Sequence, residues 1–137
     1  MRILRLVLIF CFFLFQSSYF ILAQGADLTG TWESKYSFGS VEEVMTAKIQ
    51  VVGDNLLGAF SVQPSQGARY SGIIFGTING DSAKVYYLSE RRSEGPEDAI
   101  SLADCRLADE NTIKGTFYYQ DSDMNAIPPS PFEAIRK

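Results

Sequence analysis

Apolar and polar residues alternate along short stretches of the chain from Leu28 onward, and turn residues separate these stretches. In residues 45–51, for example, every second residue is apolar and the residues between them are polar. A period of two is typical of a β-strand with one buried face, and no stretch after Leu28 keeps a helical period over about ten residues. The pattern predicts eight strands, at residues 31–38, 45–51, 56–62, 70–78, 83–88, 99–107, 112–120 and 132–136.

Turn residues separate these strands, and several of the connections are short, which favours pairing between strands that follow each other. Asn79-Gly80 is a strong two-residue hairpin signal. A recurring pattern, apolar-x-Gly-x-bulky apolar, places Gly30, Gly58, Gly76 and Gly115 beside large apolar residues. Glycines on one face of a strand suit a strongly coiled sheet that closes on itself. We therefore predict an all-β fold, an eight-stranded antiparallel up-and-down meander barrel.

The first residues have the features of a secretory signal peptide. A positive start with Arg2 and Arg5 precedes the apolar run 6–15, and small residues follow at Ala23 and Gly25. This predicts a signal peptide at 1–24, a barrel domain at 25–137, and a secreted or periplasmic protein. The alternative is an uncleaved anchor, the one case in which we expect membrane association. Removal of residues 1–24 would change the formal net charge from −4 to −6.

Composition excludes several kinds of chemistry. The chain contains no histidine, which removes catalytic triads of the Ser-His-Asp type and imidazole metal sites. An acidic domain without a basic stripe does not favour nucleic acid as a partner. Cys105 lies on an apolar strand face, so we expect a buried thiol and no nucleophile.

Three acidic groups were candidates for chemistry. Glu42-Glu43 and Glu97-Asp98 are adjacent pairs, and we expect them on solvated strand ends or loops. Asp121-x-Asp123-x-Asn125 begins like a calcium loop, but Ala126 stands where such a loop needs glycine, so an acidic turn is expected. We expect no enzyme activity, no metal and no cofactor.

The segment Leu28-Thr29-Gly30-Thr31-Trp32, together with Arg136 in the last predicted strand, resembles the signature of the calycin superfamily. The resemblance implies that the Arg136 guanidinium lies over the Trp32 indole and closes one end of the barrel. Within the superfamily the start is more similar to avidins than to lipocalins. Trp32 is the only tryptophan, however, and Phe60 stands where an avidin tyrosine is expected, so biotin binding is not implied.

Two functional hypotheses follow. In the first, the barrel binds a small apolar or mixed ligand inside, at a wall of inward-facing aromatic residues. In the second, the interior is filled and the protein acts on a protein partner, as a protease inhibitor does, through loops 90–98 and 121–131. A cavity above about 300 Å³ would favour the ligand hypothesis. The aromatic residues predicted for the ligand wall are Tyr36, Phe60, Tyr87, Phe117 and Tyr119.

Overall fold

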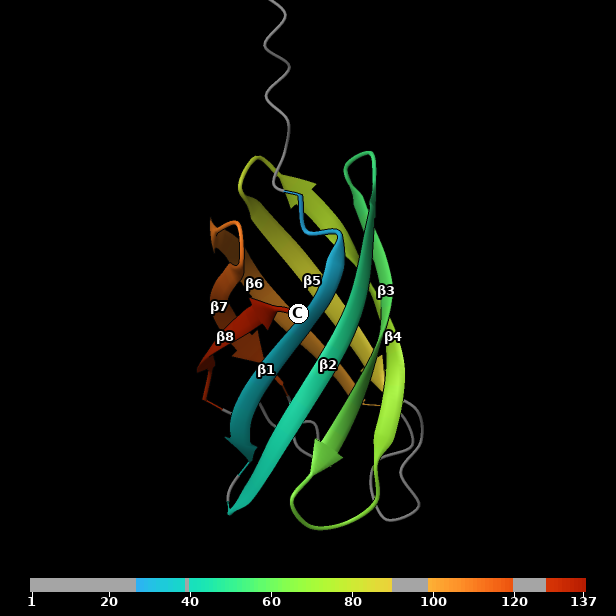
Figure 1. Cartoon of the computed structure of the whole chain (residues 1–137), viewed down its shortest axis with the longest axis vertical. Helices are drawn as coiled ribbons and strands as arrows, with labels where there is room; N and C mark the ends of the chain where they lie inside the picture. Colours follow the sequence, from blue (N-terminus) through green and yellow to red (C-terminus); the bar gives the residue numbers. More distant parts are fainter. Residues whose placement is uncertain (1–26, 39, 90–98, 120–127) are drawn as a thin grey trace, which may run out of the picture.

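Eight antiparallel strands, joined in chain order, close into a barrel in the computed structural model (Figure 1). The structure describes residues 27–38, 40–89, 99–119 and 128–137. Each strand pairs with the strands before and after it, and β1 pairs with β8 to close the ring. The predicted all-β meander barrel is therefore confirmed. The strands are β1 (Gly30–Phe38), β2 (Val41–Val52), β3 (Asn55–Pro64), β4 (Tyr70–Asn79), β5 (Ser82–Ser89), β6 (Ala99–Asp109), β7 (Thr112–Tyr118) and β8 (Ser130–Arg136).

Several strand ends differ from the prediction. β2 begins at Val41, four positions before the alternation becomes regular, because its first residues pair with the end of β1. β3 continues to Pro64, two residues beyond the predicted end of this strand at residue 62. Pairing between β3 and β4 ends at Val62 and Tyr70, so Pro64 has only β2 beside it. A proline is tolerated at such an edge.

The hairpin between β4 and β5 is shifted by one residue from the prediction. Asn79 pairs with Ser82, so the two turn residues are Gly80 and Asp81 and not Asn79 and Gly80. Gly80 has a φ of 64°, in the left-handed region that glycine adopts without a steric penalty.

Three two-residue hairpins, β2–β3, β4–β5 and β6–β7, lie at one end of the barrel, toward the top of Figure 1. Each hairpin is tied to the strand that follows it in the chain, because the second turn residue accepts a hydrogen bond from the backbone of that strand. We call this end the closed end. The three bonds join Ile78 N to Asp54 O (2.8 Å), Leu107 N to Asp81 O (3.1 Å) and Arg136 N to Asn111 O (2.9 Å).

The strand glycines allow adjacent strands to lie unusually close together. A Cβ added at Gly58 would lie 2.1 Å from the Lys48 carbonyl oxygen, and one at Gly76 would lie 2.1 Å from that of Lys84. Both contacts are far inside van der Waals distance. Any side chain at these two positions would push the strands apart where the sheet coils.

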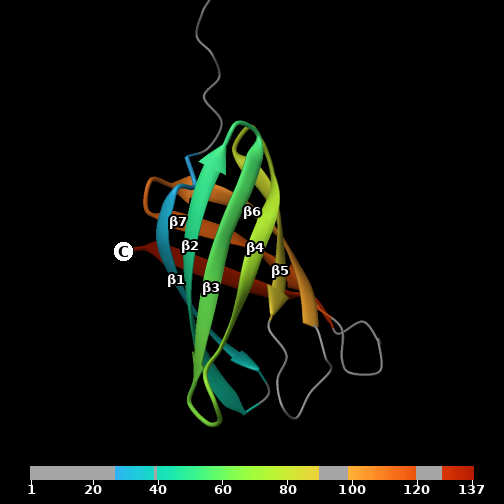
Figure 2. The ribbon, with the colours of Figure 1, turned by 90° about the vertical axis from the view of Figure 1, so that its right-hand side faces the viewer.

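The eight strands surround the interior of the barrel (Figure 2). Inward-facing residues from all eight strands form one core. The largest fully buried side chains come from the segment before β1 and from β1, β3, β4 and β5. They are Leu28, Trp32, Leu56, Val62, Ile74 and Val85.

Candidate functional site

The closed end is built around the indole ring of Trp32. This side chain is 1% exposed, and the Arg136 guanidinium carbon lies 4.3 Å from the ring centroid. The two residues are also direct partners in the pairing of β1 with β8. A Cβ at Gly30 would lie 2.7 Å from Nη1 of Arg136, so glycine leaves the space that the guanidinium occupies. The structure thus places Trp32 and Arg136 in the stacked arrangement that the sequence resemblance implied.

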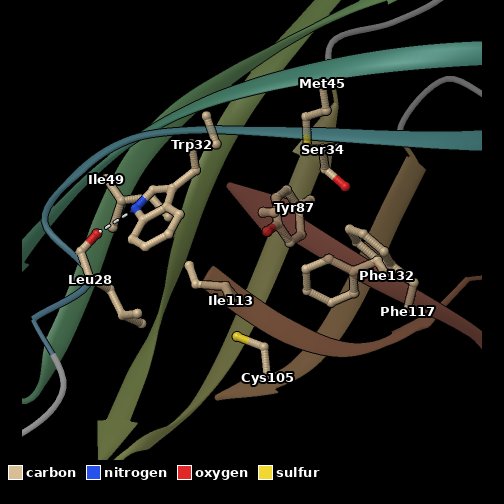
Figure 3. A pocket seen from close by; sticks show the side chains of 12 residues that line it. Leu28, Trp32, Ser34, Met45, Ile49, Tyr87, Cys105, Ile113, Phe117 and Phe132 are labelled. Carbon is tan, nitrogen blue, oxygen red and sulfur yellow. Dashed lines mark hydrogen bonds between the residues drawn. The ribbon is translucent and has the colours of Figure 1, made fainter. Parts of the chain in front are cut away.

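Hydrogen bonds fix this arrangement. Arg136 donates from Nε to the Glu110 carbonyl (2.8 Å), from Nη2 to the Asp27 carbonyl (2.9 Å), and from Nη1 to the Thr29 carbonyl. The Trp32 indole N–H donates to the Leu28 carbonyl at 2.9 Å (Figure 3). One guanidinium therefore joins the segment before β1, the β6–β7 hairpin and the aromatic ring.

Four of the five predicted wall residues come together inside the barrel. Phe60 meets Tyr87 edge to face at 5.5 Å, Tyr87 lies 5.2 Å from Phe117, and Tyr36 lies 6.3 Å from Phe117. Tyr119, the fifth, follows the last residue of β7. Of the five predicted residues, only Tyr87 and Phe117 line the central cavity described below.

Phe132 also belongs to this cluster, although it was not predicted as a wall residue. Its ring centroid lies 4.6 Å from that of Phe117. Phe132 directly follows Pro131, so the sequence offered only the short alternation Phe132-x-Ala134-x-Arg136 from which to judge where its side chain points. The shared strand face with Arg136 was the available clue.

The space left between these side chains is small. A cavity in the middle of the barrel, lined by Trp32, Ser34, Tyr87, Cys105, Phe117 and Phe132 among others, offers about 20 Å³ to the centre of a water molecule (Figure 3). A single water needs about 10–15 Å³ by this measure. This cavity therefore has room for about one water and lies well below the volume that would accept a ligand without rearrangement.

The polar groups that line this cavity are either hydrogen-bonded or uncharged at neutral pH. Ser34 donates its hydroxyl to the Glu133 carbonyl at 2.6 Å. Burial raises the pKa of the Cys105 thiol to about 11, and the neighbouring Asp104 charge adds to the effect. Burial also raises the pKa of Tyr87. Cys105 is therefore a protonated, buried thiol at neutral pH, with none of the thiolate character that a nucleophile needs.

Glu43 was predicted on a solvated strand end, and this prediction is wrong. Its side chain is 6% exposed and lies on the inward face of β2, the same face as Met45. The reason is the early start of β2, which extends the inward alternation back past the adjacent glutamate pair. Glu42, on the other face, is exposed as expected.

Glu43 belongs to a polar cluster at the end of the barrel opposite Trp32. It accepts a hydrogen bond from the Tyr70 hydroxyl at 2.9 Å. Tyr36 is its direct partner in the pairing of β1 with β2. Burial raises the pKa of Tyr36, and the charges of Tyr70 and Glu43 raise it further. The cluster thus combines a buried carboxylate with two hydroxyl groups beside the aromatic rings.

Several predicted features lie outside the described residues. These are the signal peptide at 1–24, loop 90–98 with Glu97-Asp98, and residues 121–127 with the calcium-like triad; of loop 121–131 only residues 128–131 are described. The described ranges hold no set of three or more acidic or cysteine side chains placed to share a metal ion. Within the same ranges, no helix has the length and apolarity to cross a membrane.

No protein-family model matches the chain, and no curated protein matches it either. The barrel itself is compatible with a calycin-like fold.

Proposed function

We propose that the protein is a secreted or periplasmic, non-catalytic β-barrel of the calycin type that binds a small ligand of mixed character. The binding site is the end of the barrel opposite Trp32, where Glu43, Tyr36 and Tyr70 lie beside the aromatic rings. The observation that carries the proposal is the buried carboxylate of Glu43.

A carboxylate inside a barrel costs folding free energy, because the protein has to replace the water that hydrated it. An apolar residue at this inward position of β2 would extend the core formed by Met45, Ala47 and Ile49 at no such cost. A fold that depended on its core alone would gain from that replacement. An apolar site with a few converging polar groups is instead the usual composition of a ligand pocket.

This chemistry defines the class of ligand. The Glu43 carboxylate and the tyrosine hydroxyls suit a ligand with an N–H or O–H donor group, and a cationic nitrogen would bind most strongly. The rings of Tyr36, Phe117 and Phe132 would contact its apolar or aromatic body.

The central cavity is small, and none of Glu43, Tyr36 and Tyr70 lines it, which sets a condition on this binding. Phe117 and Phe132 are only half-buried and pack on each other, so a ligand body can enter where these two rings now meet. Side-chain rotation of this kind is common at binding sites. The proposal therefore includes movement of Phe117 or Phe132.

The calycin assignment rests on the number and order of the strands and on the Trp32–Arg136 contact. Export rests on the composition of residues 1–24. A second candidate function, binding of a protein partner without a small ligand, is favoured by the nearly filled interior. The two candidates differ in whether the barrel end takes up a small molecule.

A fluorescence titration with N-phenyl-1-naphthylamine tests the proposal, since this probe carries one N–H donor on an apolar body. We expect saturable binding at one site, weakened about tenfold by Glu43→Gln, the loss of one charge-assisted hydrogen bond. Glu42→Gln is the matched control, because this exposed neighbour differs only in the face it occupies. Phe117→Arg should abolish binding and leave the β-sheet circular dichroism intact. An affinity equal in the wild type, Glu43→Gln and Phe117→Arg would refute the site.

A further inference from the structure

The ladder between β1 and β8 covers only part of each strand. It joins three residue pairs and ends at Ser34 and Ala134. β1 continues to Phe38 and β8 begins at Ser130, so within the described residues both strands extend beyond the ladder. Figures 1 and 2 both show the two ribbons diverging over these stretches. We call residues 35–38 and 130–133 the seam.

Pro131 explains why the ladder ends where it does. Along a regular strand, alternate backbone N–H groups point to opposite neighbours. The Lys137 N–H donates to the Thr31 carbonyl of β1, whereas the Arg136 N–H donates to the β6–β7 hairpin on the other side. By this alternation the nitrogen of Pro131 faces β1, and a proline nitrogen has no hydrogen to donate. A longer ladder would set Pro131 opposite Ser37, where it could donate no hydrogen bond.

Phe132 fills the seam from the inside. Its ring lines the central cavity together with Ser34 and Ala134, the last pair of the ladder. The ring is only half-buried, so one side chain borders both the cavity and the solvent. It lies over Gly115, its direct partner on β7, where an added Cβ would be 2.7 Å from Phe132 Cε1. Phe132 is therefore the barrier between the cavity and the solvent at the seam.

Of the two half-buried rings at the cavity, Phe132 has fewer contacts to lose than Phe117. Phe117 meets the rings of Tyr36 and Tyr87 as well as that of Phe132. In the described part of the chain, Phe132 meets only the ring of Phe117. β7 is paired on both sides at Phe117, whereas β8 at Phe132 is paired with β7 alone. Rotation of Phe132 toward the solvent thus breaks the fewest contacts.

We infer that the barrel opens sideways: Phe132 swings out through the seam and connects the central cavity with the solvent, while the strand pairing persists. The inference deepens the proposed function and rests on it for the purpose of the opening, which is entry of the ligand body. The route leads to the polar cluster. Extension of the β1–β8 register sets Phe132 opposite Tyr36, the direct partner of Glu43 on β2.

Cys105 reports this opening without any ligand, because its buried thiol lines the same cavity. Protein expressed from the full sequence is treated at a fixed pH with methyl methanethiosulfonate, a small neutral thiol reagent. Mass spectrometry of the peptide that contains Cys105 follows the modification. At low urea we expect a rate that barely depends on urea concentration, since opening of the seam exposes little surface. Modification through global unfolding would instead rise steeply with urea.

Two variants change the seam in opposite directions. Phe132→Ala removes the barrier and should raise the urea-independent rate at least about tenfold. Ile74→Val is its control, because it lowers global stability from within β4, the strand opposite β8 in the ring, and should change only the urea-dependent part of the rate. Pro131→Val returns an N–H to the β1 side and should lower the urea-independent rate about threefold, the effect of one added hydrogen bond. Pro129→Val, just before β8, is the matched control and should leave that rate unchanged.

Pro131→Val keeps the test decisive if Phe132→Ala does not fold. A rate in the wild type that rises steeply from zero urea would overturn the inference. So would a rate that Phe132→Ala changes no more than Ile74→Val does. Equal rates in Pro131→Val and Pro129→Val would overturn the seam as the place of opening.

The probe N-phenyl-1-naphthylamine separates this inference from the proposed function. Stopped-flow association of the probe should be faster in Phe132→Ala and slower in Pro131→Val than in the wild type. Equal association rates in the three proteins would overturn the seam as the route of entry. A wild type that binds no probe but shows the expected Cys105 rates would refute the ligand site and support the opening.

Discussion

Replacement of Arg136 by alanine tests how the barrel is closed. The change removes a guanidinium that stacks on Trp32 and donates to three backbone carbonyls. The stacking contributes about 1 kcal/mol at a half-buried site. The three carbonyls lie at the rim of the barrel, where water replaces the lost donor, so each hydrogen bond contributes about 0.5 kcal/mol. Arg136→Ala should therefore lower the free energy of unfolding by about 2–3 kcal/mol.

Urea denaturation followed by tryptophan fluorescence measures this loss directly, because Trp32 is the only tryptophan in the sequence. Arg136→Lys should lie between the wild type and the alanine variant, since lysine keeps the charge but not the planar set of donors. Arg106→Ala is the control, an exposed arginine on β6, and should change stability by less than about 0.5 kcal/mol. If Arg136→Ala costs no more than Arg106→Ala, the contact does not stabilise the barrel.

Three further predictions concern the core. Trp32→Ala should lower the free energy of unfolding by about 3–5 kcal/mol, because it truncates a buried aromatic residue. Urea denaturation followed by circular dichroism measures this change, and a loss smaller than that of Arg136→Ala would contradict the prediction. Gly76→Ala should lower the free energy of unfolding by more than about 3 kcal/mol or prevent folding, because the added Cβ would meet the Lys84 carbonyl oxygen. Thr77→Ala, at the next residue, is the control and should change this free energy by less than about 1 kcal/mol. The pKa of Cys105 is raised to about 11 by burial, so the unfolded thiol ionises first as the pH rises from about 9. Folding stability should fall by up to about 2–3 kcal/mol between pH 9 and 11, and Cys105→Ala should remove that part of the loss in urea titrations across this range.

The strands were predictable because each is a local pattern. An alternation such as that of residues 45–51 is readable from the segment alone, and closure followed from glycines such as Gly58 and Gly76 beside large apolar residues. The inward position of Glu43 was not predicted, because two adjacent glutamates interrupt the alternation of apolar and polar residues just where β2 begins. It becomes clear only when the inward face that contains Met45 is followed back along the strand by two residues.

Two properties depend on more than local pattern. The free volume inside the barrel is set by strand tilt and by the rotamers of rings such as Phe117 and Phe132, so the sequence left a hollow and a filled interior equally open. The neighbours of an outward-facing residue depend on the register between strands. Leu57 and Phe75 lie far apart in the sequence, and only the pairing of β3 with β4 makes them direct partners.

The pairing of β1 with β8 has a consequence for the synthesis of the protein. This ladder joins only three residue pairs, centred on Glu33 and Ile135, and is the shortest among the described strands. β8 is also the last of the eight strands to be made. Until it docks, β1 and β7 are both open sheet edges, and an open edge is a template for pairing with another chain. Aggregation of this protein should therefore arise during its synthesis, before β8 docks, or from breaks near β8, rather than from the closed barrel, in which β1 and β8 are paired.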